Sequence, residues 1–482
     1  MRRFLAILLA ATLAAPPAMV LPALASVAEE KKLGTEFMAQ ALPHLPLIHD
    51  YEVVSFVRGM GNKMVKTLGP QPFEFEFFVI RENSINAFAV PGGKIFVHAG
   101  LIARAESEDE LAGVMGHEIG HAHAHHMVRQ QQKGAAAGYA SLLGILLGIV
   151  NPVLAAGALA AGQAAQLKYQ RDFEREADFL GIEYARKAGY EPIALTHLLR
   201  KVYAEQQLNP TLIPPYFQSH PLSGERLTNL EAVLGKKEYS SGKIELTHRM
   251  RRAQAIARGY AQTREQAIPD YERALATASP QERPVALELL GVLMTAGEDW
   301  GMAEKYLTEA EAAGRNVDRE MGRVALRSGR LAEAKTRLER AHKKDPADWD
   351  VLSELGTIDY QEGRMKEAVA RLQASVDAEA YRPDVLQTLA RALGKTGKEG
   401  AGFYWFARTA EIQGQLPQAM VYYRRAMDAL PAGDPLREKI VKRGKELGDE
   451  IREEREERRR EGSLEPEPGV PPSQRRMPAG GR

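Results

Sequence analysis

The strongest constraint on the fold is a spacing of 34 residues that recurs in the C-terminal half of the chain. Gly322, Ala334 and Leu338 are followed 34 residues later by Gly356, Ala368 and Leu372, and Gly329 is followed by Gly363. Small residues at such places let the two helices of a pair approach closely, and each pair buries its apolar face only against a neighbouring pair. The sequence therefore predicts an all-α solenoid over residues 250–435.

This combination of small and large residues is typical of the tetratricopeptide repeat, a helix pair of about 34 residues. The pattern continues upstream through Leu290, Gly291, Met294, Ala303, Leu307 and Ala310, and downstream through Gly414, Ala419, Tyr423 and Ala426. About four repeats fit into the segment. The alternative is a helical bundle without repeats.

Residues 26–235 carry strand signals as well as helix signals, which predicts a mainly helical α+β domain with a small sheet. Residues 73–80 alternate aromatic and acidic side chains, the pattern of a half-buried strand. Residues 86–97 predict two more strands around a Pro-Gly-Gly turn. Ser107 and Glu110 form a capping box, so a helix should begin near Ser107.

The two ends of the chain differ from its folded halves. Residues 1–25 have the pattern of a secretory signal peptide, with an apolar stretch over residues 4–13 and Ala23-Leu24-Ala25 before the cleavage position. This predicts export, and we expect the periplasm; an uncleaved membrane anchor is the alternative. Residues 448–482 are first highly charged and then rich in Pro, Gly and Arg, which predicts a disordered tail.

Composition narrows the classes of function. Lys and Arg number 64 against 63 Asp and Glu, a net charge of +1, so nothing favours nucleic-acid binding. The absence of cysteine excludes disulfides, thiol nucleophiles and cysteine-bound metals. A bound metal would need histidine and carboxylate ligands, and five of the 12 histidines lie within residues 117–126.

Two of these histidines have the spacing of a zinc site. His117-Glu118-Ile119-Gly120-His121 is an H-E-x-x-H motif, and positions i and i+4 lie on one face of a helix, one turn apart. Two imidazole nitrogens placed in this way can bind one Zn²⁺ per chain. Glu118 lies beside them and can take a proton from the attacking water. The motif therefore predicts zinc-dependent peptide hydrolysis.

A catalytic zinc ion needs a third protein ligand. Glu174 is the best candidate, in a segment that opens a second helix near Asp172 and ends it near Ala188. Asp178 lies one turn further on, where it could accept a hydrogen bond from a ligand imidazole. Glu176 is the competing ligand, but its position two residues from Glu174 turns it to another face.

The remaining histidines of the cluster follow the motif on the same helix. We expect His123, His125 and His126 to be solvated at its C-terminal turn, where the helix dipole favours imidazolium, with weak metal binding as the alternative. We expect His98, in the preceding strand, to be structural.

A long uncharged segment, residues 134–166, separates the two predicted metal-binding helices. Asn151-Pro152 divides it into two halves rich in Ala, Leu and Gly, which disfavours a single straight membrane-spanning helix. We expect a helical hairpin packed on the core. The alternative is a mobile cover of the active site or a peripheral contact with a membrane.

This set of motifs resembles a known family. His117-Glu118-x-x-His121 followed by Glu174-x-x-x-Asp178 is similar to the zinc metallopeptidases that include the CaaX prenyl protease and HtpX. Two further segments resemble the same family: Asn86-Ala87-Phe88-Ala89-Val90-Pro91-Gly92-Gly93, and Ser219-His220-Pro221 with Arg226. Because tetratricopeptide repeats follow an exported catalytic domain, residues 30–430 resemble its periplasmic β-barrel assembly-enhancing type.

The resemblance implies a zincin-type fold and a periplasmic zinc endopeptidase with chaperone-like activity in outer-membrane protein assembly. Its partners would be unfolded or misassembled outer-membrane β-barrel proteins and their assembly machinery, bound by the repeats. A non-proteolytic chaperone that acts through the repeats, or a membrane-embedded HtpX-like protease, is the alternative.

The resemblance also implies roles for residues outside the H-E-x-x-H motif. His220 could occupy the fourth zinc position and silence the enzyme. Arg226 could stabilise charge on the tetrahedral intermediate, or it could form a structural salt bridge. The substrate cleft would be lined by the strand that contains Asn86, Ala87, Phe88 and Ala89.

Overall fold

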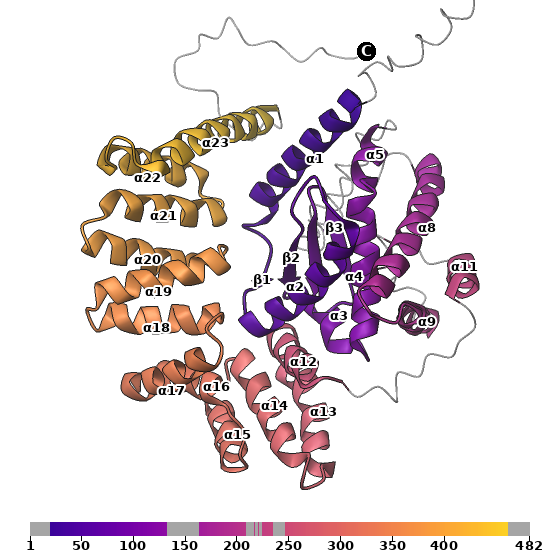
Figure 1. Ribbon diagram of the computed structural model, residues 1–482, viewed down its shortest axis with the longest axis horizontal. Helices are drawn as coiled ribbons and strands as arrows, with labels where there is room; N and C mark the ends of the chain where they lie inside the picture. The colour runs from indigo at the N-terminus through magenta and orange to yellow at the C-terminus, as the bar shows by residue number, and fades with distance from the viewer. Residues whose placement is uncertain are drawn as a thin grey trace, which may run out of the picture. The chain divides into compact units, whose positions relative to one another are not determined.

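The N-terminal half of the chain is built on a four-stranded sheet with the order β1-β2-β4-β3 (Figure 1). The computed structural model describes residues 20–132, 163–208, 216, 220, 224–234 and 246–460. The strands are β1 (Leu47–Ile48), β2 (Glu76–Ile80), β3 (Ala87–Val90) and β4 (Lys94–His98). β2 and β4 are parallel, and the two outer pairs are antiparallel. β3 therefore lies at one edge of the described sheet.

Helices pack around this sheet. They are α1 (Val20–Ala41), α2 (Tyr51–Val65), α3 (Ala99–Arg104), α4 (Glu108–His123), α5 (His126–Gln132), α8 (Gln163–Lys187), α9 (Ile193–Leu208) and α11 (Gly224–Leu234). The predicted helix start is confirmed in α4, where the Ser107 hydroxyl accepts a hydrogen bond from the backbone N–H of Glu110 at 3.1 Å. The Glu110 carboxylate accepts a hydrogen bond from the backbone N–H of Glu106 at 2.7 Å.

Strand β2 corrects the prediction of a half-buried strand over residues 73–80. The strand begins only at Glu76, and its last four residues are all buried. On one face the Phe77 ring lies directly against Gly61 of α2. Phe78 stacks on Phe96 of β4, with 4.9 Å between the ring centroids. The prediction was wrong because alternation within one segment carries no information about the helix that covers its second face.

Three predicted segments lie wholly or partly outside the described residues. Helix α1 begins at Val20, so only the last part of the predicted signal peptide is described. Residues 134–162 of the uncharged segment are outside the description, and so is the tail from residue 461. Among the helices that are described, none has the length and apolar character that a membrane span requires.

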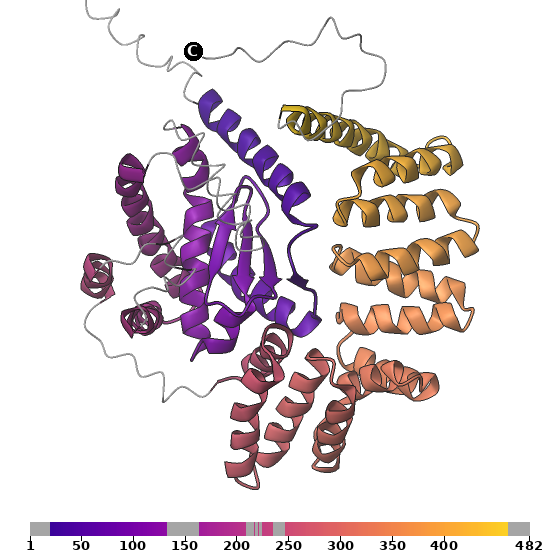
Figure 2. The same cartoon turned by 180° about the vertical axis from the view of Figure 1, so that it is seen from behind.

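The C-terminal half consists of antiparallel helices (Figures 1 and 2). They are α12 (His248–Ala261), α13 (Arg264–Thr277), α14 (Arg283–Ala296), α15 (Trp300–Ala312), α16 (Asp318–Arg327), α17 (Leu331–Lys344), α18 (Trp349–Gln361), α19 (Met365–Ala378), α20 (Pro383–Lys395), α21 (Glu399–Ile412), α22 (Leu416–Ala429) and α23 (Pro435–Arg460). A mainly helical protein with a small mixed sheet, followed by helical repeats, confirms the predicted fold class.

The repeated glycines act as the 34-residue spacing predicts. A Cβ atom on Gly322 would lie 2.8 Å from the Leu338 side chain, and one on Gly356 would lie 2.7 Å from Leu372. Only glycine therefore lets the two helices of these pairs approach so closely. Gly329 and Gly363 follow α16 and α18 with φ of +73° and +80°, a left-handed conformation that ends a helix.

The compact units of the structure do not coincide with the two domains expected from the sequence. Residues 1–355 form one compact unit and residues 356–482 form a second. The first unit includes α12, which packs against α2 and α3. The Gln254 side chain of α12 donates hydrogen bonds to the carbonyl oxygens of Ile102 and Ala105, at 3.2 and 2.7 Å. The first repeat helices thus share a core with the sheet domain.

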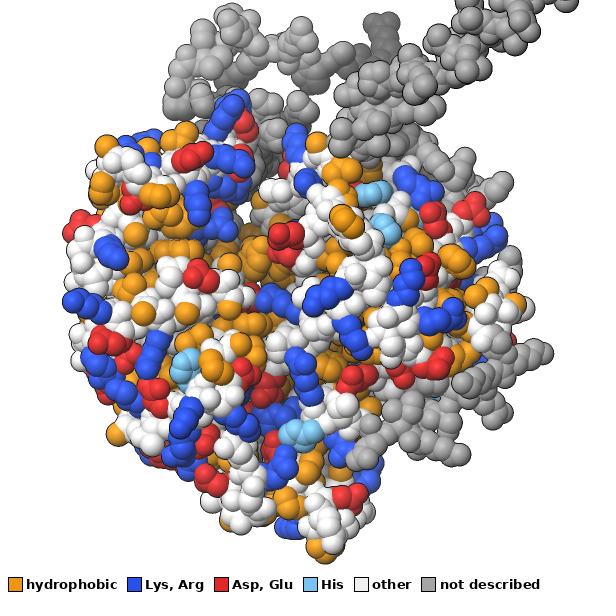
Figure 3. Space-filling view, viewed as in Figure 1, with side chains coloured by type: hydrophobic (Ala, Val, Ile, Leu, Met, Phe, Trp, Pro, Cys, Tyr) orange, Lys and Arg blue, Asp and Glu red, His pale blue; other side chains and the backbone are white. Residues whose placement is uncertain are grey.

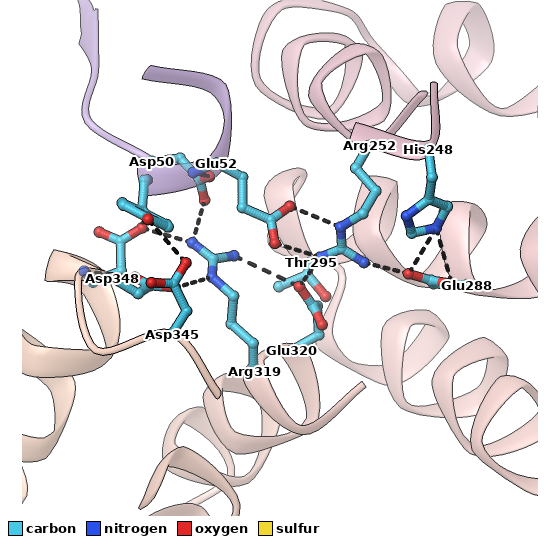
Figure 4. Close-up of polar contacts among 12 residues, drawn as sticks. Asp50, Glu52, His248, Arg252, Glu288, Thr295, Arg319, Glu320, Asp345 and Asp348 are labelled. Atoms are coloured by element: carbon cyan, nitrogen blue, oxygen red, sulfur yellow. Dashed lines mark hydrogen bonds and ion pairs between the residues drawn. The ribbon is translucent and has the colours of Figure 1, made fainter. Parts of the chain in front are cut away.

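A group of charged residues, here called the charged cluster, lies where α2 meets these helices (Figure 4). It consists of Asp50, Glu52, Arg252, Glu288, Arg319, Glu320, Asp348 and Asp350. Arg252 contacts Glu52, Glu288 and Glu320 at 2.8, 2.6 and 2.5 Å. Arg319 contacts Asp348 and Asp350 at 2.8 Å, and Asp50 at 3.3 Å. Acidic and basic side chains are also interspersed over the face shown in Figure 3, in agreement with the small net charge.

Candidate metal centre

The candidate metal centre is positioned by an unusually close approach of α4 and α8. A Cβ atom on Gly120 would lie 2.8 Å from the carbonyl oxygen of Ala177, and one on Gly116 would lie 2.9 Å from that of Gly181. Any larger residue at these places would push the helices apart. Sequence reasoning missed this contact, although the spacing Gly116-x-x-x-Gly120 within the histidine motif is a visible signal for it.

The two helices bring the predicted ligands together. The Nε2 atoms of His117 and His121 are 3.0 Å apart, and each lies 3.3 Å from a carboxylate oxygen of Glu174. His117 is fully buried and Glu174 is 4% exposed. One donor atom from each of these residues and from His220 lies within 4.8 Å of all the others. Glu176, the competing ligand, is not part of this group.

His220 is the fourth member of this group. Its Nδ1 atom is 3.3 Å from His117 Nε2 and 3.1 Å from Glu174 Oε1. Its Nε2 atom is 3.3 Å from Glu118 Oε1. The imidazole therefore lies between the ligand atoms and Glu118, in the space that an attacking water would need.

Asp178 and Arg226 hold the outer side of the centre. His117 Nδ1 lies 2.8 Å from Asp178 Oδ1. Arg226 binds Asp178 through Nε and Nη2, both at 2.8 Å, and its Nη1 lies 2.7 Å from Glu174 Oε2. Burial lowers the pKa of His117, but the Asp178 charge and hydrogen bond outweigh burial and raise this pKa to about 9.

Glu118 is buried beside the ligands, and neither of its carboxylate oxygens has a hydrogen bond of good geometry within the described residues. Its nearest polar neighbours are His220 Nε2, at 3.3 Å from Oε1, and the backbone of Ala89, which lowers its pKa. Burial raises its pKa to about 7, against the lowering effect of His117 and His121. A carboxylate with a pKa near neutrality can both accept and return a proton. This is the property that a general base at a metal-activated water requires.

The donor set fits Zn²⁺. Tetrahedral zinc bonds of about 2.0–2.1 Å place neighbouring ligand atoms roughly 3.3 Å apart. The observed separations are 3.0 Å between the imidazole nitrogens and 3.3 Å from each to the carboxylate. Two imidazoles and one carboxylate are a common ligand set for a catalytic zinc ion.

The predicted solvation of the later histidines is wrong for His126, whose side chain is buried and 3% exposed. Helix α4 ends at His123, and His125 has φ of +54°, so the chain turns before α5 starts. This turn carries His126 back towards the ligand His121, with 2.9 Å between their Nδ1 atoms. His126 Nε2 lies 3.1 Å from Glu176 Oε2. The spacing of the histidines could not show this break between the two helices.

The other two histidines also have partners. His123 Nδ1 lies 2.5 Å from the Tyr184 hydroxyl, and His125 Nδ1 lies 2.5 Å from Glu30. His98 is buried against the Ser84 hydroxyl at 2.8 Å, which agrees with a structural role. The edge strand β3 packs next to α4, so the predicted substrate strand lies beside the helix that carries the motif.

Two segments of the chain match known protein families, and several known proteins are similar in sequence. Residues 56–234 match the model of peptidase family M48, and residues 325–398 match that of the tetratricopeptide repeat. A putative β-barrel assembly-enhancing protease of Vibrio cholerae is 32% identical over 243 residues, which cover 48% of this chain and 50% of that protein. The β-barrel assembly-enhancing protease of Escherichia coli is 30% identical over 212 residues, 42% of this chain and 43% of that protein.

A third relative comes from a different kind of organism. The mitochondrial metalloendopeptidase OMA1 of Arabidopsis thaliana is 32% identical over 177 residues, which cover 35% of each chain. The similarity thus spans half or less of the length of these curated relatives. Because the matched segment contains the H-E-x-x-H helix, Glu174 and His220, this chain carries a peptidase domain of family M48 together with tetratricopeptide repeats.

Proposed function

We propose that this chain is a periplasmic zinc metalloendopeptidase that cleaves outer-membrane β-barrel proteins during their assembly and also assists them as a chaperone. The observation that best supports peptide hydrolysis is Glu118, a buried carboxylate that has no hydrogen bond of good geometry in the described part of the chain and lies beside four potential metal ligands. The printed names of the relatives support the role in β-barrel assembly. The repeats support binding of a protein partner.

His117, His121 and Glu174 would hold the metal. When bound, Zn²⁺ supplies polarisation of the scissile carbonyl and lowers the pKa of the attacking water. Asp178 accepts a hydrogen bond from His117 Nδ1, which keeps the Nε2 lone pair of His117 directed at the centre. Since Arg226 already binds Asp178 and Glu174, we assign it to holding these carboxylates rather than to the tetrahedral intermediate.

Glu118 would act as the general base. Its carboxylate accepts a proton from the attacking water and then donates that proton to the leaving amine. His220 must first move away, because its Nε2 atom lies 3.3 Å from Glu118 and its Nδ1 atom contacts Glu174. The arrangement described above would then be the resting form, and displacement of His220 would activate the enzyme.

The edge strand β3 would bind the substrate. An extended peptide can add to an exposed sheet edge through backbone hydrogen bonds, which are indifferent to most side chains. Such recognition suits unfolded or half-assembled β-strands. The segment around Asn86, Ala87, Phe88 and Ala89 would provide this edge next to α4.

The test is a trapping experiment with the Glu118→Gln variant of the full chain. We expect the variant to retain one zinc ion per chain, to lose cleavage of an unfolded outer-membrane β-barrel protein, and to stay bound to that substrate. Unchanged cleavage would contradict the assignment of the base. In cells that lack the gene, rescue by Glu118→Gln would contradict an essential proteolytic role and favour a chaperone. Release of the protein from cells by osmotic shock would check the periplasmic location.

A further inference from the structure

The two ligand histidines of the centre differ in what their outer nitrogens contact. His117 Nδ1 contacts a carboxylate directly, whereas His121 Nδ1 lies 2.9 Å from a second imidazole, that of His126. His126 Nε2 in turn lies 3.1 Å from Glu176 Oε2. The His126 ring stacks on Phe173 with 4.5 Å between centroids, so its orientation is fixed by packing.

The hydrogen-bond chain determines where each proton must be. The ionised carboxylate of Glu176 only accepts hydrogen bonds, so His126 Nε2 must carry a proton. A neutral His126 then has a lone pair on Nδ1, which accepts a hydrogen bond from the Nδ1–H of His121. His121 therefore presents the lone pair of Nε2 to the centre, where that atom lies 3.0 Å from His117 Nε2.

The same logic applies to the other ligand. His117 donates through Nδ1 to Asp178, and the guanidinium of Arg226 holds that carboxylate. On the second side, the Arg129 guanidinium lies 2.9 Å from the same Glu176 oxygen that faces His126. Each ligand imidazole is thus linked to a carboxylate of α8 that pairs with an arginine. The link from His117 to Asp178 is direct, whereas the link from His121 to Glu176 passes through the imidazole of His126.

We propose that His126 and Glu176 are positioning residues that hold His121 in its metal-ligating tautomer and orientation. The inference rests on the proposed function, because it concerns how tightly this centre holds zinc. It assigns a role to two residues that the H-E-x-x-H motif does not include. Outer partners of ligand histidines typically contribute about 10–100-fold to metal affinity.

The decisive variant is His126→Phe. Phenylalanine keeps an aromatic ring against Phe173 but removes both nitrogens, so it separates hydrogen bonding from packing. The matched control is His123→Phe, the same substitution at a partly buried histidine whose partner, Tyr184, lies outside the chain of contacts. Zinc affinity of the full-length proteins is measured by competition with a chromogenic chelator, and thermal unfolding of the metal-free proteins is recorded in parallel.

We expect His126→Phe to weaken zinc binding by about 10–100-fold, with metal-free unfolding close to that of the parent protein and with His123→Phe unchanged. Equal affinity of His126→Phe and the parent protein would overturn the inference and leave the proposed function standing. A parent protein that binds no zinc would overturn both.

A second variant keeps the test valid if His126→Phe does not fold. Glu176→Ala removes a side chain that is 42% exposed, so it should not affect folding. Without this carboxylate, His126 is no longer held with its proton on Nε2. We therefore expect weaker zinc binding than in the parent protein, by a smaller factor than for His126→Phe. Unchanged affinity of Glu176→Ala would likewise overturn the inference.

Discussion

The metal centre and the charged cluster are both buried, both polar and both within residues 1–355, yet their side chains are paired in opposite ways. In the charged cluster, Arg252 contacts three carboxylates and Arg319 contacts four. In the metal centre, three imidazoles and a carboxylate crowd one point, and Glu118 forms no hydrogen bond of good geometry in the described structure.

The comparison separates buried polar groups that stabilise the fold, as in the charged cluster, from buried polar groups suited to catalysis, as in the metal centre. Buried polar groups are almost always paired, so an unpaired one calls for an explanation such as catalysis or an absent ion. The charged cluster satisfies its groups across elements far apart in the sequence, from Asp50 to Asp350. In the metal centre the outer nitrogens of His117 and His121 have their own partners, Asp178 and His126, while the inner nitrogens of both face one another and Glu174.

The largest expected effect is the loss of peptidase activity in Glu118→Gln. Glutamine has the same shape but cannot accept the water proton, so kcat/KM should fall by about 10²–10⁴-fold. Zinc content measured by atomic absorption should stay at one ion per chain, because Glu118 is not a ligand. Loss of the zinc together with the activity would instead assign Glu118 to metal binding.

The next largest effect is a loss of stability, not of activity, and is expected when Arg319 is replaced. Arg319→Met removes the arginine that pairs with the buried carboxylate of Asp348 and leaves Asp50 with Arg323 alone, which should lower the free energy of unfolding by about 3–5 kcal/mol. The measurement is the urea midpoint. The matched control is Arg330→Met, whose partly exposed pairs with Glu304 and Glu333 should contribute about 0–1 kcal/mol. Equal effects at the two arginines would contradict the structural role of the charged cluster.

A smaller effect, of opposite sign, is expected at His220. If His220 silences the resting enzyme, His220→Ala should raise basal cleavage by about tenfold, the gain when a ~10% populated competent state becomes the whole population. The variant should still bind zinc, because His117, His121 and Glu174 remain as ligands. The assay is hydrolysis of an unfolded β-barrel substrate, and an unchanged or lower rate would contradict the silencing role.

A further effect is a dependence of stability on pH that comes from Glu288. Burial raises its pKa, but the hydrogen bond with His248 and the charge of Arg252 outweigh burial and lower the pKa to about 2. A carboxyl group whose pKa is lower in the folded state stabilises the fold above its ordinary pKa of 4.5, and this stabilisation is lost as the pH falls towards 2. The difference in urea midpoint between the parent protein and Glu288→Gln should therefore shrink from pH 5 to about pH 2. A difference that does not change with pH would contradict the assignment.

Features that depend on spacing within a short segment could be predicted from the sequence. The glycine–leucine contacts of the repeats follow from positions 16 residues apart, such as Gly322 with Leu338. The helix start at Ser107 and the shared face of His117 and His121 follow from the geometry of one helix. In each case the partners lie on one helix or on two consecutive helices, so the chain itself brings them together.

Features that depend on what packs against a segment could not be predicted. The second face of β2 is buried because α2 covers it, and His126 is buried because the turn at His125 directs its side chain towards His121. The charged cluster has no local signal at all, since Asp50 and Arg319 are 269 positions apart. Its residues looked like ordinary surface charges in the sequence.

The sequence alone determined the type of chemistry, because the absence of cysteine and the H-E-x-x-H spacing restrict a metal to histidine and carboxylate ligands. It also determined the repeat architecture, because helix periodicity is a local property. Only the tertiary structure decided which carboxylates surround those histidines and in which order. Glu174, Glu176 and Asp178 lie within one turn of a single helix, and their separate contacts depend on how α8 packs against α4.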